Sequence, residues 1–446
     1  MTIKLSDIAA CFEGVIPSII ASASADGTPN ISYLSHVVMV DDAHIALSNQ
    51  FFAKTAANIR ANPRAELLLV DGGNGAQFRL DVTFAQSVDT GPLFERIARQ
   101  LLASSAQVGM ADVMRLKSAD IFRVDAVTAV PSPVDWAKAP SRIDAFSLAT
   151  IARITKSLEM QTDTGDIIDL LLSAIVTELG YDGALVMLGH PQSDMLVTVG
   201  STGYAASGLG SEMQIGAGLI GLAAAHGQTI KVNEMSRVRR LGAAIIEASD
   251  VDENATRTIS FPQMPGAQSQ IAVPMIAQDK MRGVLFVESR RNLAFLADHE
   301  AALEILARQA AAALALCEME SSESAPAIAG AAAGSASRGR NIQVVHHGFD
   351  DSIFIDNNYV IKGVAGRLLA FMLERFIEEG RCDFTNREIR LFDGLRLPDV
   401  KDNLETRLLL LQRRLEEKAF PVRLTRSGRG RITLSVSGRP VLKNAD

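Results

Sequence analysis

The sequence predicts a multidomain α+β protein in which three folded blocks follow one another along the chain. A chain of 446 residues is too long for one ordinary hydrophobic core. Residues 320–340 are rich in alanine, serine and glycine and cannot build a core, and residues 130–140 contain three prolines that interrupt regular structure. We therefore expect domains at residues 1–135, 141–319 and 341–446, with residues 320–340 as a flexible linker.

The composition is that of a soluble globular protein, with 48% hydrophobic and 21% charged residues. No apolar run approaches the roughly 18–20 residues of a membrane span. The first residues lack the basic region and apolar run of a signal peptide. Cys11, Cys317 and Cys382 lie far apart, which argues against a disulfide framework or a structural zinc site. We expect a cytoplasmic protein with no membrane partner and no bound metal.

The first block reads as short strands with helical inserts. Apolar, β-type runs occupy residues 16–23, 31–40, 44–48, 65–70, 78–89 and 120–130. Helical segments are expected at residues 54–60, where Asn62-Pro63 ends the helix, and at residues 93–102. Many short strands with few helices predict a small closed β-barrel.

The turn at residues 26–30, Ser32 on the next strand, the segment 54–70 and the closing strand 121–127 give this block a specific resemblance. It resembles the split β-barrel of the pyridoxamine 5′-phosphate oxidase-like family. In that family the lysine and neighbouring residues of the segment equivalent to residues 54–70 commonly meet the phosphate of FMN, usually at a dimer interface. The resemblance therefore implies an FMN site and a homodimer. The residues expected to hold the cofactor are Lys54, Thr55, Asn58, Arg60, Ser32 and Gln50.

Two other occupants of the barrel stay open. Members of the family also bind haem or a deazaflavin, and some bind nothing. His36 and His44 lie in strand runs, and either could ligate haem, although a lone histidine on an apolar strand is more often a packed, hydrogen-bonded residue. Tyr33 could line a cofactor pocket. No substrate-binding cluster follows, so the sequence favours a non-enzymatic barrel over an active oxidase.

The middle block combines helices with a sheet. Helices are expected at residues 146–158, 164–179, 222–226 and 298–318, and strands at 183–189, 196–200 and 229–232. A β-hairpin is expected from residues 269–276 and 282–288, with Asp279-Lys280 at its tip. The paired segments 215–221 and 273–287 resemble a GAF domain, which implies a small-molecule or redox sensor that dimerises through flanking helices such as 298–318.

The glycine-rich segment 215–221 does not predict a nucleotide site. It lacks the Gly-Lys-Ser/Thr ending of a P-loop, and Gly216, Gly218 and Gly221 do not match a dinucleotide fingerprint. We interpret these glycines as determinants of the sensor fold.

The third block has the parts of a winged helix-turn-helix. Two strands at 349–361 precede a helix at 366–379, and a capping box starts a second helix at Thr385. A third helix at residues 399–418 is expected to bury Leu404, Leu408, Leu411 and Leu415. Strands 422–424 and 431–436 then pair as a hairpin around Ser427-Gly428. The order resembles the winged-helix output domain of response-regulator transcription factors.

Charge distinguishes this block from the rest of the chain. Residues 407–431 contain eight basic and two acidic side chains, whereas the whole protein carries a net charge of −7. A local excess of positive charge attracts phosphates whatever the chain average is. The third helix could enter a major groove and the hairpin could reach backbone phosphates. The expected DNA-binding residues are Arg407, Gln412, Arg413, Arg414, Arg426, Arg429 and Arg431.

The sequence thus predicts a ligand- or redox-responsive transcription regulator, assembled as a homodimer through the barrel and the helices of the sensor. A small-molecule ligand and DNA are the expected partners. The alternative is a flavin-dependent oxidase or reductase with accessory domains. A structural DNA-associated protein with empty sensory domains is a third reading, and a winged helix used for protein contact stays open as well.

Overall fold

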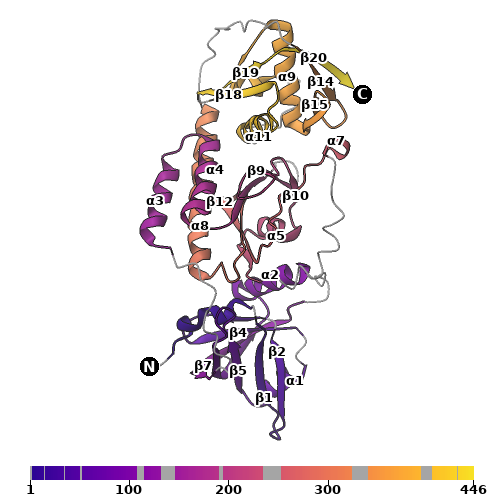
Figure 1. Ribbon diagram of the computed structural model, residues 1–446. Helices are drawn as coiled ribbons and strands as arrows, with labels where there is room; N and C mark the ends of the chain where they lie inside the picture. The colour runs from indigo at the N-terminus through magenta and orange to yellow at the C-terminus, as the bar shows by residue number, and fades with distance from the viewer. Residues whose placement is uncertain are drawn as a thin grey trace.

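The computed structural model describes residues 3–14, 16–34, 36–50, 53–107, 115–131, 146–189, 194–234, 253–323, 340–392, 404–428 and 430–445. Three domains are stacked in chain order (Figure 1). The N-terminal domain lies at one end, a central sheet with its helices lies in the middle, and the C-terminal domain lies at the other end.

The N-terminal domain is built on one antiparallel sheet. Its strands are β1 (Ser18–Ala23), β2 (Pro29–Leu34), β3 (Val37–Met39), β4 (His44–Asn49), β5 (Arg64–Val70), β6 (Gln77–Val88) and β7 (Ser118–Val130). The 3₁₀-helix η1 (Leu5–Glu13) and the helices α1 (Ala53–Ala61) and α2 (Pro92–Gln107) accompany them. The strand order β2-β1-β5-β6-β7-β4-β3 leaves β2 and β3 as edges among the described residues. Among the described residues the sheet therefore does not close between these two strands, so the predicted closed barrel is a half-barrel, which is consistent with the resemblance to a split β-barrel.

Alternation along the strands places the core of this domain. Side chains in β1 alternate between buried and half-buried, as expected when one face of a sheet is covered. Ile20, Ile45, Leu67, Leu69 and Leu80 from neighbouring strands are fully buried in a single cluster. Burying such aliphatic side chains stabilises the fold by about 1.5–3 kcal/mol each.

The central domain contains a six-stranded antiparallel sheet in the order β10-β9-β8-β13-β12-β11. The strands are β8 (Gly183–Gly189), β9 (Met195–Thr202), β10 (Glu212–Gln214), β11 (Ile230–Val232), β12 (Ser269–Ala277) and β13 (Lys280–Ser289). The helices are α3 (Leu148–Glu159), α4 (Thr164–Ser173), η2 (Ala174–Glu178), α5 (Gly218–His226), α7 (Glu253–Thr256) and α8 (Ala297–Glu323).

Helices cover both faces of this sheet, so its strands are apolar on both sides. Val186 and Leu188 of β8 belong to the core formed with α3, α4 and α8. Leu185 and Met187 of the same strand belong to the core formed with α5. All four side chains are at most 4% exposed. The continuous apolar run of β8 thus follows from burial on both faces.

The glycine-rich segment 215–221 leads into α5 and sets the path of the backbone there, in agreement with its interpretation as a determinant of the fold. Gly216 and Gly218 adopt φ values of +91° and +59°, which favour glycine. A Cβ atom on Gly221 would lie 2.3 Å from the carbonyl oxygen of Gln214. The segment therefore needs glycine for its backbone path rather than for a phosphate.

The described part of the C-terminal domain contains two small sheets and three helices. One sheet has the order β16-β15-β14-β20 and the other the order β17-β19-β18. The strands are β14 (Asn341–His347), β15 (Ser352–Ile355), β16 (Asn358–Ile361), β17 (Asp383–Thr385), β18 (Val422–Gly428), β19 (Arg431–Val436) and β20 (Arg439–Ala445). The helices are α9 (Gly363–Glu379), α10 (Asn386–Leu391) and α11 (Leu404–Glu417).

Several local predictions for this domain are confirmed. Thr385 is the N-cap of α10, and its hydroxyl accepts a hydrogen bond from the backbone N–H of Glu388 at 3.3 Å. The four predicted leucines of α11 are buried, with at most 3% exposure. Residues 399–403 of the predicted third helix lie outside the described residues.

Other elements differ from the predictions. The sequence missed β14 and β20, which pair in parallel and join the two ends of the C-terminal domain. Helix α8 continues to Glu323, into the predicted linker. The tip of the β12–β13 hairpin is Gln278-Asp279, both at positive φ, and Lys280 already belongs to β13.

None of the described helices is long and apolar enough to cross a lipid bilayer.

Candidate functional site

A hydrogen-bond cluster fastens α1 to the edge of the N-terminal sheet. The side-chain amide of Asn30 donates to Thr55 Oγ1 at 3.0 Å, and the hydroxyls of Ser32 and Thr55 are 2.9 Å apart. Asn58 Nδ2 donates to Ser22 Oγ at 3.2 Å. Thr55 and Asn58 are buried. The structure thus brings three predicted cofactor residues together, in contacts within the protein.

A groove beside α1 carries side chains that suit a phosphate. This groove has a volume of about 470 Å³. Its polar walls include Asn49, Arg60, Ser87, Asp89, Lys117 and Ser118. The hydroxyls of Ser87 and Ser118 and the side-chain amide of Asn49 already donate to the carboxylate of Asp120. The two cations, Arg60 and Lys117, are the side chains of this groove that suit an anionic group such as the phosphate of FMN.

The predicted cofactor residues are divided between these two places. Arg60 lines the groove, whereas Lys54 is exposed on α1 outside it. Gln50 is buried at the end of β4, with its amide Nε2 3.4 Å from Ser48 Oγ. Lys117 was missed by sequence reasoning, because only the pairing of Ser118 with Asn49 in the sheet brings it to the groove.

The two histidines considered for haem have different surroundings. Burial lowers the pKa of His36 to about 4, so its imidazole is neutral at physiological pH. His44 lies at a half-exposed position with its Nδ1 2.9 Å from Asp41 Oδ1. Among the described residues, no group of three or more His, Cys, Asp and Glu side chains is placed to hold a metal ion.

The predicted DNA-binding helix α11 packs against the central domain. Arg413 Nη1 donates to the carbonyl oxygen of Val199 at 2.8 Å, and Arg413 Nη2 pairs with Asp169 Oδ1 of α4 at 2.7 Å. Gly200 leaves room for this guanidinium, because a Cβ atom there would lie 2.6 Å from Arg413 Nη1. Leu409 of the same helix is buried in the core of the central domain.

Arg426 of the hairpin makes a similar contact. Its guanidinium pairs with Asp163, the N-cap residue of α4, and with Glu405 Oε2 at 2.8 Å. The side chain of Arg426 is 21% exposed. Two arginines predicted to bind DNA, Arg413 and Arg426, are therefore paired with carboxylates on α4 and at its N-cap.

The remaining predicted residues of this group have mixed positions. Arg414 is 2% exposed and donates from Nε to the carbonyl oxygen of Val360 at 3.2 Å, inside the C-terminal domain. Gln412 bonds to Glu416 on the exposed side of α11, and Arg407 lines a cavity between the domains. Arg431 is exposed on the hairpin. Arg429 lies outside the described residues.

Further ion pairs cross the same interface. Arg257 of the central domain pairs with Asp350 at 3.1 Å, and Lys362 at the start of α9 pairs with Glu212 of β10 at 3.0 Å. No local pattern predicts these pairs, because their partners are separated by about a hundred residues or more.

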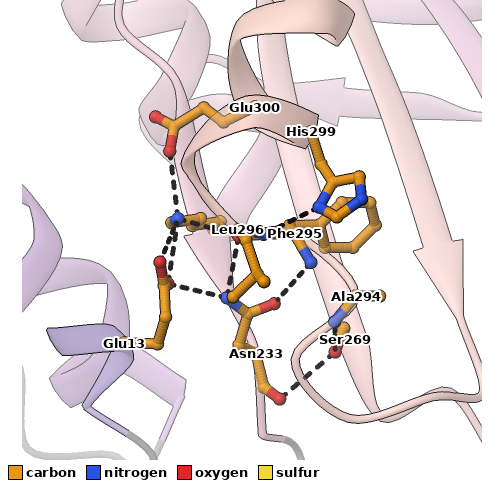
Figure 2. Close-up of polar contacts among 9 residues, drawn as sticks. Glu13, Asn233, Ser269, Ala294, Phe295, Leu296, His299 and Glu300 are labelled. Atoms are coloured by element: carbon orange, nitrogen blue, oxygen red, sulfur yellow. Dashed lines mark hydrogen bonds and ion pairs between the residues drawn. The ribbon is translucent and has the colours of Figure 1, made fainter. Parts of the chain in front are cut away.

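The N-terminal and central domains meet around Lys231 of β11. Its ammonium group lies 2.9 Å from Glu13 Oε2 and 3.0 Å from Glu300 Oε2, and it donates to the carbonyl oxygen of Phe295 at 2.8 Å. Figure 2 shows Asn233 bridging Glu13 and Phe295 in the same network. Burial by itself lowers the pKa of Lys231, but the two glutamates outweigh it and raise the pKa overall. The interface between the two domains therefore stabilises the charged ammonium form of Lys231.

Comparisons with known families agree with this domain organisation. Residues 6–129 match the family described as pyridoxamine 5′-phosphate oxidase, and residues 161–315 match the GAF domain family. The N-terminal domain is therefore pyridoxamine 5′-phosphate oxidase-like, and the central domain is a GAF domain. Together they indicate a multidomain protein with a sensory or regulatory role. No curated protein matches the chain.

Solved structures similar to single domains include three with informative descriptions. The GAF domain of an Acinetobacter phosphoenolpyruvate-protein phosphotransferase is 19% identical, with 39% of this chain and 94% of that chain covered and a TM-score of 0.32. An FMN-binding protein from Syntrophomonas wolfei is 18% identical over 28% and 86% of the two chains, with a TM-score of 0.25. A free methionine-R-sulfoxide reductase from Neisseria meningitidis is 19% identical over 40% and 98%, with a TM-score of 0.30. Scores of this size add no argument to the family matches.

Proposed function

We propose that the protein is a cytoplasmic, ligand- or redox-responsive transcription regulator whose C-terminal domain is a winged helix that binds DNA. One observation carries this proposal. Helices α10 and α11 are followed by the β18–β19 hairpin, which closes a three-stranded sheet with β17, the strand that precedes α10. A helix pair followed by such a hairpin is the order of elements in a winged helix-turn-helix.

The charge of the hairpin supports a nucleic-acid partner. Arg423 and Arg431 are exposed on its two strands. Guanidinium groups at the edge of a hairpin can contact phosphates while a neighbouring helix approaches base edges. We therefore add Arg423 to the expected phosphate contacts.

The sensor supplies the regulation in this proposal. Asp163, the N-cap residue of α4, pairs with Arg426, and Asp169 of α4 pairs with Arg413. DNA phosphates would otherwise contact these two guanidinium groups. DNA and α4 then compete for the same side chains. A signal that separates the GAF domain from α11 increases DNA affinity, since a ligand shifts an equilibrium by its preference for one state.

The proposed assembly is a homodimer. Ile31 and Tyr33 are more than 70% exposed on the edge strand β2. Ile305, Leu316 and Met319 are exposed by 48% to 60% on the long helix α8. Large apolar side chains gathered on an edge strand and on one helix suit contacts with a second copy of the chain.

The test is DNA binding by the full chain, measured as fluorescence anisotropy of a labelled duplex at several salt concentrations. We expect salt-sensitive binding, weakened by the double substitution Arg423→Ala/Arg431→Ala, which also reduces the salt dependence by about two phosphate contacts. Substitution of the exposed Arg123 in the barrel is the matched control. Absence of salt-sensitive binding by the full chain and by the Asp163→Asn/Asp169→Asn variant would refute the proposal.

A second candidate, a flavin-dependent oxidase or reductase, is favoured by the groove at Arg60 and Lys117. Its test is the absorption spectrum of the purified protein, followed by titration with FMN. If the protein binds flavin and the double substitution Arg60→Ala/Lys117→Ala abolishes that binding, the groove is the binding site of the flavin phosphate. Turnover with a reduced nicotinamide or pyridoxamine phosphate would then favour the enzyme over the regulator.

A further inference from the structure

A cavity lies between the GAF domain and the C-terminal domain. Its volume is about 380 Å³, within the range of small-molecule sites. The GAF side contributes residues of β8, β9 and β10 and the segment after α7, and the C-terminal side contributes β16, α9 and α11. The cavity therefore exists only when the two domains are docked.

The walls of this cavity are mainly apolar. Leu188, Val199 and Ile259 come from the GAF domain, and Ile361 and Leu410 come from the C-terminal domain. Each of these side chains is at most 8% exposed, and Leu188 and Val199 also belong to the core of the GAF domain. Apolar walls favour a ligand with an aliphatic or aromatic body.

Charged residues line the same cavity with an excess of cations. The pairs Arg257–Asp350 and Lys362–Glu212 each join the two domains across it, and Arg407 adds a further guanidinium. Helix α9 begins beside it, with no side-chain hydrogen bond from its N-cap residue Lys362. Cationic side chains and the first N–H groups of a helix both favour a negative group.

We propose that this cavity binds a small organic anion, an apolar body carrying one carboxylate or similar acidic group. Because both domains form its walls, the ligand binds the docked arrangement and stabilises it. This regulatory effect rests on the DNA-binding function proposed above. The ligand lowers DNA affinity because Arg413 and Arg426 remain paired with Asp169 and Asp163 of the GAF domain. The cavity is separate from the groove at Arg60 in the N-terminal domain.

The first experiment measures binding without DNA. Decanoate is titrated into the full chain by calorimetry, with decyltrimethylammonium as a cation of equal chain length. We expect decanoate to bind and the cation to bind at least about tenfold more weakly. The cavity-filling substitutions Ala365→Leu and Val197→Phe should abolish decanoate binding, whereas Val441→Phe on β20, at a position outside the cavity, should leave it unchanged.

Two substitutions of one ion pair separate a binding site from a structural contact. Lys362→Met removes a cation from the cavity and should weaken decanoate binding by about threefold to tenfold, whereas Glu212→Gln removes an anion and should strengthen it by about threefold. Both break the same pair, so a merely structural role would move the two variants in the same direction. That result, or equal binding of the cation, would overturn the proposal.

The regulatory step has its own measurement. Decanoate should lower the DNA affinity of the full chain and leave that of Ala365→Leu unchanged. If the chain binds decanoate but shows no affinity for DNA, the proposed ligand site is supported and the proposed DNA-binding function is rejected. If the chain binds DNA but shows no binding specific to decanoate, the ligand site is rejected and the proposed DNA-binding function is kept.

Discussion

Arg413 of α11 and Asp169 of α4 form an ion pair at 2.7 Å although 244 residues separate them in the chain. Arg413 also donates to two backbone carbonyls of the GAF domain, those of Val199 and Gly165. The side chain of Arg413 is 13% exposed. The helix expected to read DNA is thus the helix that docks the C-terminal domain onto its sensor.

The double substitution Asp163→Asn/Asp169→Asn should increase DNA affinity. It removes the two GAF-domain carboxylates that pair with Arg426 and Arg413 and leaves the pair of Arg426 with Glu405 inside the C-terminal domain, so less free energy opposes release of α11. We expect a gain of about threefold to tenfold in anisotropy titrations at low salt. Asp166→Asn changes an exposed carboxylate on the same helix and is the control for the loss of negative charge. Equal gains in both proteins would mean that general charge, and not docking, sets the affinity.

Arg414→Met should destabilise the C-terminal domain. Arg414 is 2% exposed, and its guanidinium pairs with Glu417 at 2.9 Å and donates to Val360. Its removal leaves the carbonyl oxygen of Val360 without this donor and leaves a cavity in place of a buried side chain, at a cost of about 2–4 kcal/mol. The readout is thermal unfolding followed by calorimetry. Arg423→Met, at an exposed position, should leave the unfolding temperature unchanged while it weakens DNA binding. A stable Arg414→Met protein would contradict the structural role.

Lys231→Met should loosen the N-terminal domain from the GAF domain. It leaves Glu13 and Glu300 facing each other without a cation, and Glu13 is only 11% exposed. Breaking a largely buried pair in this way costs about 3 kcal/mol. We expect a lower unfolding temperature for the barrel and faster hydrogen exchange in η1. The exposed Lys280→Met on the β12–β13 hairpin is the matched control, and a loss of equal size there would point to net charge instead.

Glu288→Gln should stabilise the GAF domain at neutral pH. Burial raises the pKa of Glu288, while the hydrogen bond from Gln270 and the charge of Arg290 lower it in part. A raised pKa means that the folded state prefers the neutral acid, so stability falls as the pH rises above the ordinary glutamate value of 4.5. Glutamine keeps the acceptor for Gln270 without the charge.

We expect the Glu288→Gln gain to be about 1 kcal/mol at pH 7 and to vanish below pH 4.5, where both proteins are neutral at this position. Urea unfolding at a series of pH values measures it. Glu374→Gln on the exposed face of α9 serves as the comparison. A gain that persists at low pH would show that charge burial is not its cause.

Local patterns in the sequence were enough to predict many elements. Strand alternation, the stop at Asn62-Pro63 and the capping box at Thr385 depend on neighbouring residues, and the structure places the corresponding elements within a few positions. The family resemblances of the first two domains are confirmed by the family matches. Strands β14 and β20 escaped prediction because each is stabilised by pairing with the other, from opposite ends of the domain.

The candidate sites were less predictable than the fold. Arginine spacing indicated a basic surface, but it could not show that Arg414 turns into the core of its own domain and that Arg413 turns toward the GAF domain. Lys117 joins Arg60 only through the pairing of β4 with β7.

The sequence by itself determined the order of the domains, the amphipathic faces of their helices and the concentration of positive charge near the C-terminal end. These properties are periodic or local, so they can be read from neighbouring residues. The tertiary structure alone decided which carboxylates hold those charges and where the domain interfaces enclose a cavity. Such contacts join residues hundreds of positions apart, and their free energy depends on packing that no local pattern encodes.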